Sequence, residues 1–368
     1  MTHDKPVVWF HCASLGEFEQ GRPIIEGYRL KQPEHKIVVT FFSPSGYEAK
    51  KGDPIAEWIF YLPLDTCQNV RRFLDAVQPA KAIFIKYEFW YNYLTALKRR
   101  QIPTYVVSAT FRQSQPFFKW YGAIFRRMLS AFTLTFVQNQ SSKELLNKIS
   151  FTQAVVTGDT RFDRVWVQAQ RPCSLPIVEA FLNTSPQDVI VAGSTWPKDE
   201  ELLFKLLYEH KQLKIILVPH EIDQRRITAV MEQFALFSPV QYTQLSGPEM
   251  VNHDSRVMVV DTIGMLSSLY RFGSIAYIGG GFDDGIHNIL EAAVYGIPVI
   301  FGPNYQKFNE ACDLLKTGGA FSVKTCLQLK AQIKTFLTIP HLRMKGGEAC
   351  INYVRTHLGA AKIVLEHI

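Results

Sequence analysis

Two kinds of segment alternate along almost the whole chain. Short runs rich in valine, isoleucine and phenylalanine are followed by amphipathic segments of about a dozen residues. In the longer segments apolar residues recur at three- and four-residue spacing, which is typical of helices. Strands that alternate with helices form βαβ units, so the pattern predicts parallel sheets covered by helices. The predicted fold class is therefore α/β.

The alternation is interrupted once. The first half predicts strands at 7–12, 37–42, 59–62, 82–85, 104–107, 134–137 and 154–156, and helices at 70–77, 92–99, 120–131 and 142–149. Over 164–187 the segments RPCSLP and NTSPQD contain three prolines and no clear strand, which indicates a domain boundary. The second half predicts strands at 189–192, 215–218, 240–242, 257–260, 275–278 and 298–301, and helices at 200–210, 225–234, 265–271, 288–295 and 309–316.

The two halves predict two Rossmann-like, doubly wound domains, residues 1–168 and 169–345. Residues 346–368 are helical in character and are expected to form a C-terminal helix that packs back toward the first domain. Two such domains facing each other would place a cleft between the carboxyl ends of both sheets, where folds of this kind bind ligands.

Composition excludes several classes of protein. A hydrophobic fraction of 47% and a charged fraction of 20% argue against disorder. The six cysteines form no CxxC pair, so no zinc site or disulfide framework is predicted. No signal peptide is visible, and the apolar runs are too short to cross a bilayer. The net charge of +7 indicates acidic partners, although solvated lysines explain it equally well.

Candidate site residues follow strand ends in the first half. In ASLGEFEQG, Ser14, Gly16 and Glu17 lie between the first strand and a helix, where small residues let a ligand approach the backbone. Glu17 is placed to act as a general base, or is only a carboxylate that favours the start of a helix. In IKYEFWYN, Lys86 and Glu88 stand beside aromatic rings, which suits a sugar or a lipid headgroup, although such rings are usually core.

The second half has a glycine-rich turn between a strand and a predicted helix, in YIGGGFDDGIHNILEAAVYGIPVIFGP. Gly279–Gly281 would let a phosphate reach backbone N–H groups, and the helix beginning near His287 would offer it a positive end. Glu291 could reach ribose hydroxyls. Neither a Walker motif nor GxGxxG is matched, and tight turns alone would also explain the glycines.

Two more strand ends carry polar residues. In AGSTWPKDEE, Ser194 or Thr195 could cap the helix that begins near Pro197, or contact phosphate or sugar. In VPHEIDQRR, His220 and Arg225 could neutralise an anionic donor, although a histidine at such a place is more often structural.

The motifs HCASLGE, YEFWYN, TGDTRFD, AGSTW, VPHE, VDTIGML and GGGFDDGIHNILEAAVYGIPVIFGP occur in this order between about residues 8 and 309. In this the chain resembles the Kdo (3-deoxy-D-manno-octulosonic acid) transferases of lipopolysaccharide synthesis. The resemblance implies a GT-B fold and inverting transfer of Kdo from CMP-Kdo to the 6′-hydroxyl of a tetraacylated, bisphosphorylated lipid A precursor. It implies no metal and no cofactor, and no nucleic-acid partner is predicted.

Carried over motif by motif, the resemblance makes Glu17 the catalytic base and lets Ser14 and Gly16 shape its turn. The donor would be held by Ser194, Thr195, His220, Glu221, Gly280, Gly281, His287, Asn288 and Glu291. The acceptor would meet Lys86, Glu88 and the basic residues Arg126, Arg127 and Arg161. Swapping Arg126 and Arg127 for Ser is expected to raise the acceptor's KM more than the donor's.

The chain departs from the family pattern at four places. Lys86 stands where relatives have an acid, TGDTRFD has Arg161 where lysine is common, and no histidine follows Thr195. The hydrophobic anchor helix that usually precedes the first motif is not seen. We therefore expect peripheral attachment to the cytoplasmic face of the Gram-negative inner membrane through basic and aromatic surface.

Two other functions stay open. A GT-B glycosyltransferase or epimerase that uses a UDP-sugar would share the glycine-rich motif but not the whole set. A nucleic-acid-binding protein would explain the pI near 9.0, but the chain has no RRM, KH or helix-turn-helix signature.

Overall fold

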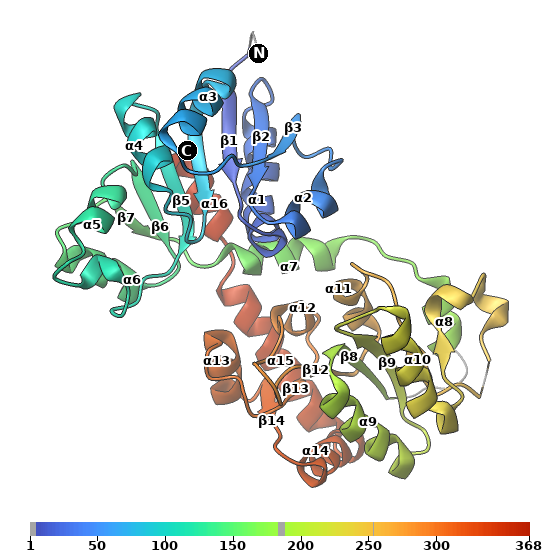
Figure 1. The fold of residues 1–368 in the computed structure, drawn as a ribbon. Coiled ribbons are helices and arrows are strands. Elements are labelled where there is room, and N and C mark those ends of the chain that lie inside the picture. The colour runs from blue at the N-terminus through green and yellow to red at the C-terminus, as the bar shows by residue number, and fades with distance from the viewer. Residues whose placement is uncertain (1–4, 183–187, 253) are drawn as a thin grey trace. The chain divides into compact units, whose positions relative to one another are not determined.

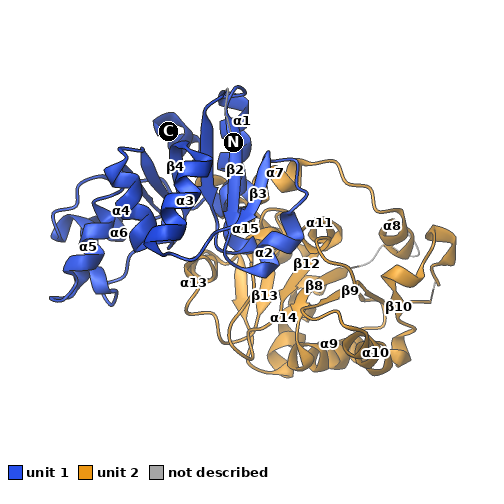
Figure 2. Ribbon diagram, turned by 45° about the horizontal axis from the view of Figure 1, so that its top comes forward, with its two compact units in different colours: residues 1–164, 357–368 blue, residues 165–356 orange. Residues whose placement is uncertain are grey.

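The computed structural model of the protein describes residues 5–182, 188–252 and 254–368, so residues 183–187 of the predicted domain break lie outside the description. The chain forms two compact units, Met1–Arg164 with His357–Ile368 (unit 1) and Val165–Thr356 (unit 2) (Figure 1; Figure 2). Each unit has one seven-stranded parallel sheet, which confirms the predicted α/β class. No helix of the described ranges combines the length and apolarity needed to span a membrane.

The sheet of unit 1 has the strand order β3-β2-β1-β4-β5-β6-β7. Its strands are β1 (Val7–His11), β2 (Lys36–Phe41), β3 (Trp58–Tyr61), β4 (Pro79–Ile85), β5 (Thr104–Ala109), β6 (Leu134–Val137) and β7 (Ala154–Val156). The order reverses direction between β1 and β4, which pair in parallel. At such a reversal the connections leave in opposite directions and open a crevice at the carboxyl ends of the strands.

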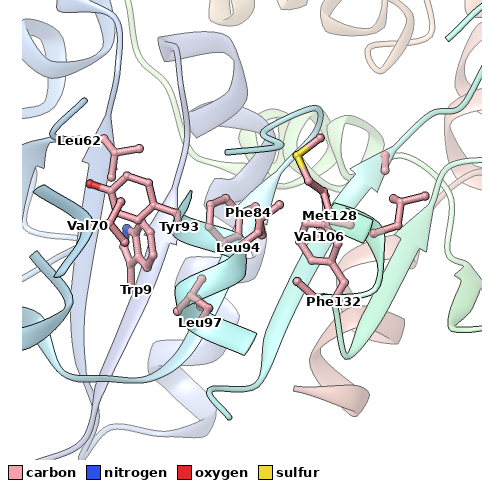
Figure 3. Packing of buried hydrophobic residues seen from close by; sticks show 14 of the residues in the cluster. Trp9, Leu62, Val70, Phe84, Tyr93, Leu94, Leu97, Val106, Met128 and Phe132 are labelled. Carbon is pink, nitrogen blue, oxygen red and sulfur yellow. The ribbon is translucent and has the colours of Figure 1, made fainter. Parts of the chain in front are cut away.

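Helices cover both faces of this sheet. Every residue of β1 is therefore buried, although successive side chains point to opposite faces. Trp9 packs with Phe84 and Tyr93 beneath α3 (Cys67–Val77) and α4 (Tyr91–Arg99) (Figure 3). Phe10 packs on the other face with Tyr28 of α1 (Leu15–Lys31) and Val364 of α16 (Ala360–His367). The other helices of this unit are α2 (Pro44–Lys50), η1 (Pro116–Phe118), α5 (Ala123–Leu129), α6 (Gln140–Lys148) and the first turns of α7 (Thr160–Gln170).

Unit 2 repeats the plan with the order β10-β11-β9-β8-β12-β13-β14. Its strands are β8 (Val189–Thr195), β9 (Lys214–Pro219), β10 (Val240–Gln241), β11 (Val257–Val259), β12 (Ile275–Ile278), β13 (Val299–Phe301) and β14 (Ala320–Ser322). Its α-helices are α8 (Pro176–Leu182), α9 (Pro197–Glu209), α10 (Gln224–Gln233), α11 (Leu266–Leu269), α12 (Leu290–Ala293), α13 (Asn309–Thr317), α14 (Cys326–Thr338) and α15 (Pro340–Thr356), with η2–η5 at Ala235–Phe237, Tyr242–Gln244, Pro248–Met250 and Tyr270–Phe272. Here the order reverses between β8 and β12.

The unit boundaries differ from the predicted ones at both ends of unit 2. The first falls at 164/165, inside the continuous helix α7, instead of at 168/169. The second falls at 356/357, because α15 belongs to unit 2. A Cβ on Gly347 of α15 would lie 2.0 Å from the carbonyl oxygen of Gly296, so this helix packs directly on the turn before β13. Only residues after Thr356 return to unit 1, where Asp163 accepts hydrogen bonds from the N–H groups of Gly359 (2.8 Å) and Ala361 (2.9 Å) at the start of α16.

Candidate active site

Both strand-order reversals carry residues that the sequence singles out. In unit 1, β1 is followed by Ser14 and Glu17, and its neighbour β4 is followed by Lys86 and Glu88. In unit 2, β8 is followed by Trp196, and its neighbour β12 by the glycine turn. Strand ends that lie far apart in the sequence therefore meet at the crevice of each unit, where open α/β sheets bind their ligands.

Glu17 lies in the first turn of α1 and is half-buried. Ser14 is the N-cap of the helix, and its hydroxyl accepts a hydrogen bond from the N–H of Glu17 (3.4 Å). The Glu17 carboxylate accepts one from the N–H of Ala13 (2.6 Å). Both interpretations of Glu17 are therefore compatible with its contacts. Its carboxylate stabilises the start of the helix, and as a partly buried carboxylate it could also act as a general base. A Cβ on Gly16 would meet no atom within 4 Å, so the space above this turn is open.

The pKa of Glu17 is raised from 4.5 to about 7. Burial is the largest cause, since it penalises the charged form, and the neighbouring Glu88 raises the pKa further. The N–H groups of Ala13 and Ser14 and the ammonium of Lys86 act in the opposite direction. A carboxyl group with a pKa near neutrality is suited to exchange protons with a substrate hydroxyl.

A buried chain of hydrogen bonds holds Glu88. Its Oε2 accepts a bond from Trp90 Nε1 (2.6 Å) and lies 3.3 Å from His11 Nε2. On the far side of the imidazole, Nδ1 lies 2.9 Å from the hydroxyl of Thr40, which accepts from Trp9 Nε1 (2.8 Å). Nδ1 also lies 3.2 Å from the carbonyl oxygen of Thr40, and a proton on Nε2 lets the ring donate to Glu88. The opposite tautomer would set a bare nitrogen against a carboxylate.

His11 is therefore a positioning residue that the sequence reasoning missed. It is fully buried, and it fixes Glu88, which raises the pKa of Glu17. Its place at the last position of β1, facing the end of β4, becomes meaningful only when those two strands are known to be neighbours.

The backbone of Lys86 adopts a left-handed conformation (φ +72°) at the end of β4. This is unfavourable for a residue with a side chain, and such strain gathers at functional sites. The residue is anchored because its N–H donates to the carbonyl of Val107 (2.8 Å).

The three arginines predicted to meet the acceptor differ in their environment. Arg126 donates to the carbonyl oxygens of Phe117 and Lys119 (3.0 Å each), so its guanidinium holds the segment before α5 together. Arg161 donates through Nε to the carboxylate of Asp159 (2.8 Å). Arg127 is exposed. Arg127 is therefore the best placed of the three to meet a phosphate.

The glycine turn of unit 2 is packed against backbone. A Cβ on Gly279 would lie 2.2 Å from Ser194 O, and one on Gly281 would lie 2.6 Å from Gly302 N. Gly280 has φ +87°, which favours glycine. Close packing therefore requires all three glycines whether or not a ligand binds.

Two N–H groups expected to bind phosphate are already engaged. Gly279 N–H donates to the carbonyl of Gly193 (2.9 Å), and Gly280 N–H donates to Asp199 (2.9 Å). Both N–H groups point at protein acceptors, and a contact of this turn with phosphate stays a prediction. The helix predicted at 288–295 is present but shorter, because α12 spans only Leu290–Ala293. The Asn288 side chain accepts from Leu290 N–H (3.1 Å) and competes with a helical continuation, so no long helix dipole is available here.

Asp199, to which the sequence pattern assigns no role, organises this region. Its carboxylate is buried and accepts hydrogen bonds from Trp196 N (3.0 Å), Gly280 N (2.9 Å) and Tyr277 Oη (2.7 Å). Burial raises its pKa. The residue joins the start of α9 to the glycine turn, and an aspartate at the third position of a predicted helix is the signal that could have revealed it.

Neither Ser194 nor Thr195 caps α9, contrary to expectation: the N-cap is Trp196, because β8 extends to Thr195. The Thr195 hydroxyl is buried and donates to Glu200 (2.9 Å), which in turn pairs with Arg226. Ser194 takes a left-handed conformation (φ +52°) at the strand end.

Three rings form a stack beside the glycine turn. The ring of His220 lies 4.8 Å from that of Trp196 and 4.4 Å from that of His287, both nearly parallel to it. Trp196 Nε1 donates to His287 Nε2 (3.2 Å), and burial with the neighbouring His220 lowers the pKa of His287. The stack thus presents aromatic surface, and the lowered pKa of His287 favours the neutral form of that ring. Trp196 and His287 line a hollow of about 480 Å³, and the other lining residues are Pro197, Lys198, Gly280, Asp283, Asp284 and Gly285.

The remaining candidates lie nearby. Asn288 donates to the carboxylate of Glu291 (3.0 Å), and Glu221 is exposed at the end of β9. Across the described residues, no group of three or more histidine, cysteine or acidic side chains is arranged to hold a metal ion.

Comparison with known proteins decides the family. A profile of the 3-deoxy-D-manno-octulosonic-acid transferase (kdotransferase) family matches residues 1–164. The 3-deoxy-D-manno-octulosonic acid transferase of Aquifex aeolicus is 30% identical over 343 residues, which cover 91% of this chain and 87% of that protein. This chain belongs to the Kdo transferase family. The Haemophilus influenzae 3-deoxy-D-manno-octulosonic acid transferase is 27% identical and matches 98% of this chain and 86% of its own length.

Solved structures support the predicted GT-B fold of this Kdo transferase family member. The UDP-GlcNAc 2-epimerase of Neisseria meningitidis superposes with a TM-score of 0.68 over 98% of each chain, at 16% identity. A glycosyltransferase from Rickettsia africae gives 0.62 over 99% of this chain and 98% of that one, at 15% identity. Identities this low show the fold alone.

Proposed function

We propose that this protein transfers Kdo from CMP-Kdo to the 6′-hydroxyl of a tetraacylated lipid A precursor, with inversion and without a metal ion. The observation that carries the proposal is the half-buried Glu17, whose pKa is about 7, beside Glu88 at the strand-order reversal of unit 1 in a chain of this family. We place the reaction at the cytoplasmic face of the Gram-negative inner membrane.

The reaction needs a base and a stabilised leaving group. The Glu17 carboxylate takes the proton of the acceptor hydroxyl while that oxygen forms a bond to the anomeric carbon of Kdo. The bond from this carbon to the phosphate oxygen of CMP breaks on the opposite face, and CMP departs with the electron pair, which inverts the configuration. Glu17 then releases the proton to solvent. The requirements are those of general base catalysis with electrostatic stabilisation of the leaving phosphate.

We assign donor binding to unit 2. The aromatic stack of Trp196, His220 and His287 offers a flat surface for a nucleotide base or a sugar, and Asn288 and Glu291 offer polar groups for ribose hydroxyls. We also keep in the proposed donor site five residues that lie beside the hollow or at the strand ends: Ser194, Thr195, Glu221, Gly280 and Gly281. Thr195, Gly280 and Gly281 contribute by holding the backbone, since their contacts lie within the protein.

The test is mass spectrometry of a tetraacyl lipid A precursor after incubation with the protein and fresh CMP-Kdo in detergent. A gain of one or more Kdo residues is expected, and it also counts the sugars transferred. In parallel, CMP should bind more tightly than UMP. No mass gain, with tighter UMP binding, would contradict the proposal and would favour a UDP-sugar enzyme of the same fold.

A pH profile tests the assignment of Glu17. Because the negative charge of Glu88 raises the pKa of Glu17, Glu88→Gln should lower that pKa, and the acid limb of kcat/KM should move to lower pH. Burial, the larger cause, should keep the midpoint above the ordinary glutamate value. Glu19→Gln is the matched control, since Glu19 lies on the same helix and is not among the main causes of the raised pKa of Glu17. An acid limb that stays in place in Glu88→Gln would exclude Glu17 as the titrating group.

A further inference from the structure

Lys86 carries a charge without a close partner at the candidate active site. It is half-buried at the carboxyl end of β4. In the parts of the chain that the structure describes, no ion pair or hydrogen bond engages its ammonium. Lysine is seldom withdrawn from water without a partner, because the charged form loses solvation. A half-buried ammonium of this kind is therefore a candidate for binding an anion from outside the protein.

The two neighbouring carboxyl groups are engaged by other donors. Oε2 of Glu88 accepts a hydrogen bond from Trp90 Nε1 (2.6 Å), and the carboxylate of Glu17 accepts one from Ala13 N–H (2.6 Å). Burial and Glu88 raise the pKa of Glu17, and the charge of Lys86 acts against them. The ammonium therefore lies close to the proposed base without being bound to it.

The backbone holds this strand end in place. Lys86 has φ +72°, a left-handed conformation that is unfavourable for a residue with a side chain. Its N–H donates to the carbonyl of Val107 (2.8 Å), next to the pairing of Ile85 with Val107 in the sheet. Strain of this kind persists only where the surrounding structure enforces it, and it is concentrated at functional sites. The place of Lys86 is therefore set by the two strands that flank β4, which are β1 and β5.

The surroundings of Lys86 leave room for a ligand. A Cβ on Gly16 would meet no atom within 4 Å, so the turn before the proposed base is open. Tyr87, the next residue along the chain, is 38% exposed. A partly exposed ring beside a few charged groups is a common arrangement in ligand sites. These surroundings suit a sugar that carries an anionic group.

We propose that Lys86 binds an oxyanion of one of the two substrates beside Glu17. The proposal deepens the proposed function and rests on it for the reaction that Glu17 serves. Glu17 and Glu88 alone would repel an approaching anion, so the ammonium is the group that makes this place suitable for one. Two sources carry the same chemistry, a phosphate of the acceptor and the carboxylate of Kdo. The acceptor is favoured, because its hydroxyl must reach Glu17.

The first test is the KM of each substrate for Lys86→Gln, with transfer measured in detergent. The KM of the substrate that carries the oxyanion should rise at least about tenfold, the effect of losing one charge-assisted hydrogen bond. A rise for the acceptor assigns the oxyanion to its phosphate, and a rise for CMP-Kdo assigns it to the carboxylate. Lys86→Arg keeps the charge and should keep most of the affinity.

A pH profile gives a readout that a purely structural role would not change. Because Lys86 opposes the effects of burial and of Glu88 on the pKa of Glu17, Lys86→Gln should raise that pKa further. The acid limb of kcat/KM should then move to higher pH, opposite to the shift expected for Glu88→Gln. Lys86→Arg should leave the limb in place.

Lys81→Gln is the matched control. Lys81 is also half-buried in β4, but it lies toward the amino end, where its ammonium is 5.6 Å from the ring centre of Tyr28. This variant should leave both KM values and the acid limb unchanged. Lys86→Gly tests for a folding defect, because glycine favours the left-handed conformation. It should melt no lower than the unchanged protein and show the same rise in KM as Lys86→Gln.

Binding of inorganic phosphate, measured by calorimetry without either substrate, separates this proposal from the proposed function. Lys86→Gln should weaken this binding at least about tenfold. If the unchanged protein transfers no Kdo but binds phosphate through Lys86, the proposal stands and the proposed function fails. Kdo transfer with both KM values and the acid limb unchanged in Lys86→Gln would overturn the proposal and leave the proposed function in place.

Discussion

Glu17→Gln is expected to slow Kdo transfer about 100- to 10,000-fold, the range that a positioned general base contributes. The amide cannot take the proton of the acceptor hydroxyl. Its oxygen can still accept the hydrogen bond from Ala13 N–H, so the start of α1 should persist. Single-turnover transfer measured by mass spectrometry, with CMP-Kdo binding measured by calorimetry, should show a large loss of rate and an unchanged donor affinity.

Stability gives this experiment an internal control. The pKa of Glu17 in the folded protein, about 7, lies above its ordinary value of 4.5, so the folded state binds the proton more tightly than the unfolded state. The free energy of unfolding therefore falls as pH rises from about 4.5 through 7. Above this window Glu17→Gln should melt at a higher temperature than the unchanged protein, and below it the difference should vanish.

The matched variant Glu19→Gln should behave in the opposite way. Burial alone would raise the pKa of Glu19, but Arg164, Arg22 and Lys50 together outweigh it and lower that pKa, so the charge of Glu19 stabilises the fold at neutral pH and its loss should lower the melting temperature. A Glu17→Gln protein that transfers Kdo at the unchanged rate would assign the base to another residue. A lowered melting temperature of Glu17→Gln at neutral pH would contradict the raised pKa of Glu17.

Much of the fold is readable from the sequence because it depends on local patterns. Short apolar runs that alternate with helical segments, such as the run that contains Trp9 and Phe10, mark strands. Ser14, followed by Glu17 three residues later, marks the start of a helix. The predicted helix at 120–131 begins only at Ala123, because the preceding segment forms tight turns in which Lys119 N–H donates to Pro116 O (3.1 Å) and Gly122 N–H donates to Lys119 O (3.0 Å).

What the sequence does not reveal depends on which strands are neighbours. His11 and Glu88 are 77 residues apart and meet because β1 pairs with β4. Asp199 and Gly280 are 81 residues apart and meet because β8 pairs with β12. The glycine turn shows the consequence. Its sequence suggests a phosphate site, but two of its N–H groups donate to protein acceptors. These hydrogen bonds form only because strands that are distant in the sequence pair in the sheet.

The contact between Asp199 and the glycine turn leads to the second large effect. Asp199→Ala should lower the free energy of unfolding of unit 2 by about 3 kcal/mol or more, because it strands the N–H groups of Trp196 and Gly280 and the Tyr277 hydroxyl without a partner. For a unit of this size the melting temperature should fall by about 10 °C. Faster hydrogen–deuterium exchange of the β12 segment and weaker CMP binding should accompany the loss.

Asp199→Asn is the matched control for this prediction. Trp196 N and Gly280 N donate to the same oxygen of Asp199, Oδ2. An asparagine with its carbonyl oxygen there keeps both bonds, and its amide can donate to the Tyr277 hydroxyl instead of accepting from it. Because burial raises the pKa of Asp199, removal of the charge should cost nothing, and this variant should match or exceed the stability of the unchanged protein. Equal destabilisation by Asn and Ala would mean that the negative charge itself, and not the hydrogen bonds, holds the glycine turn in place.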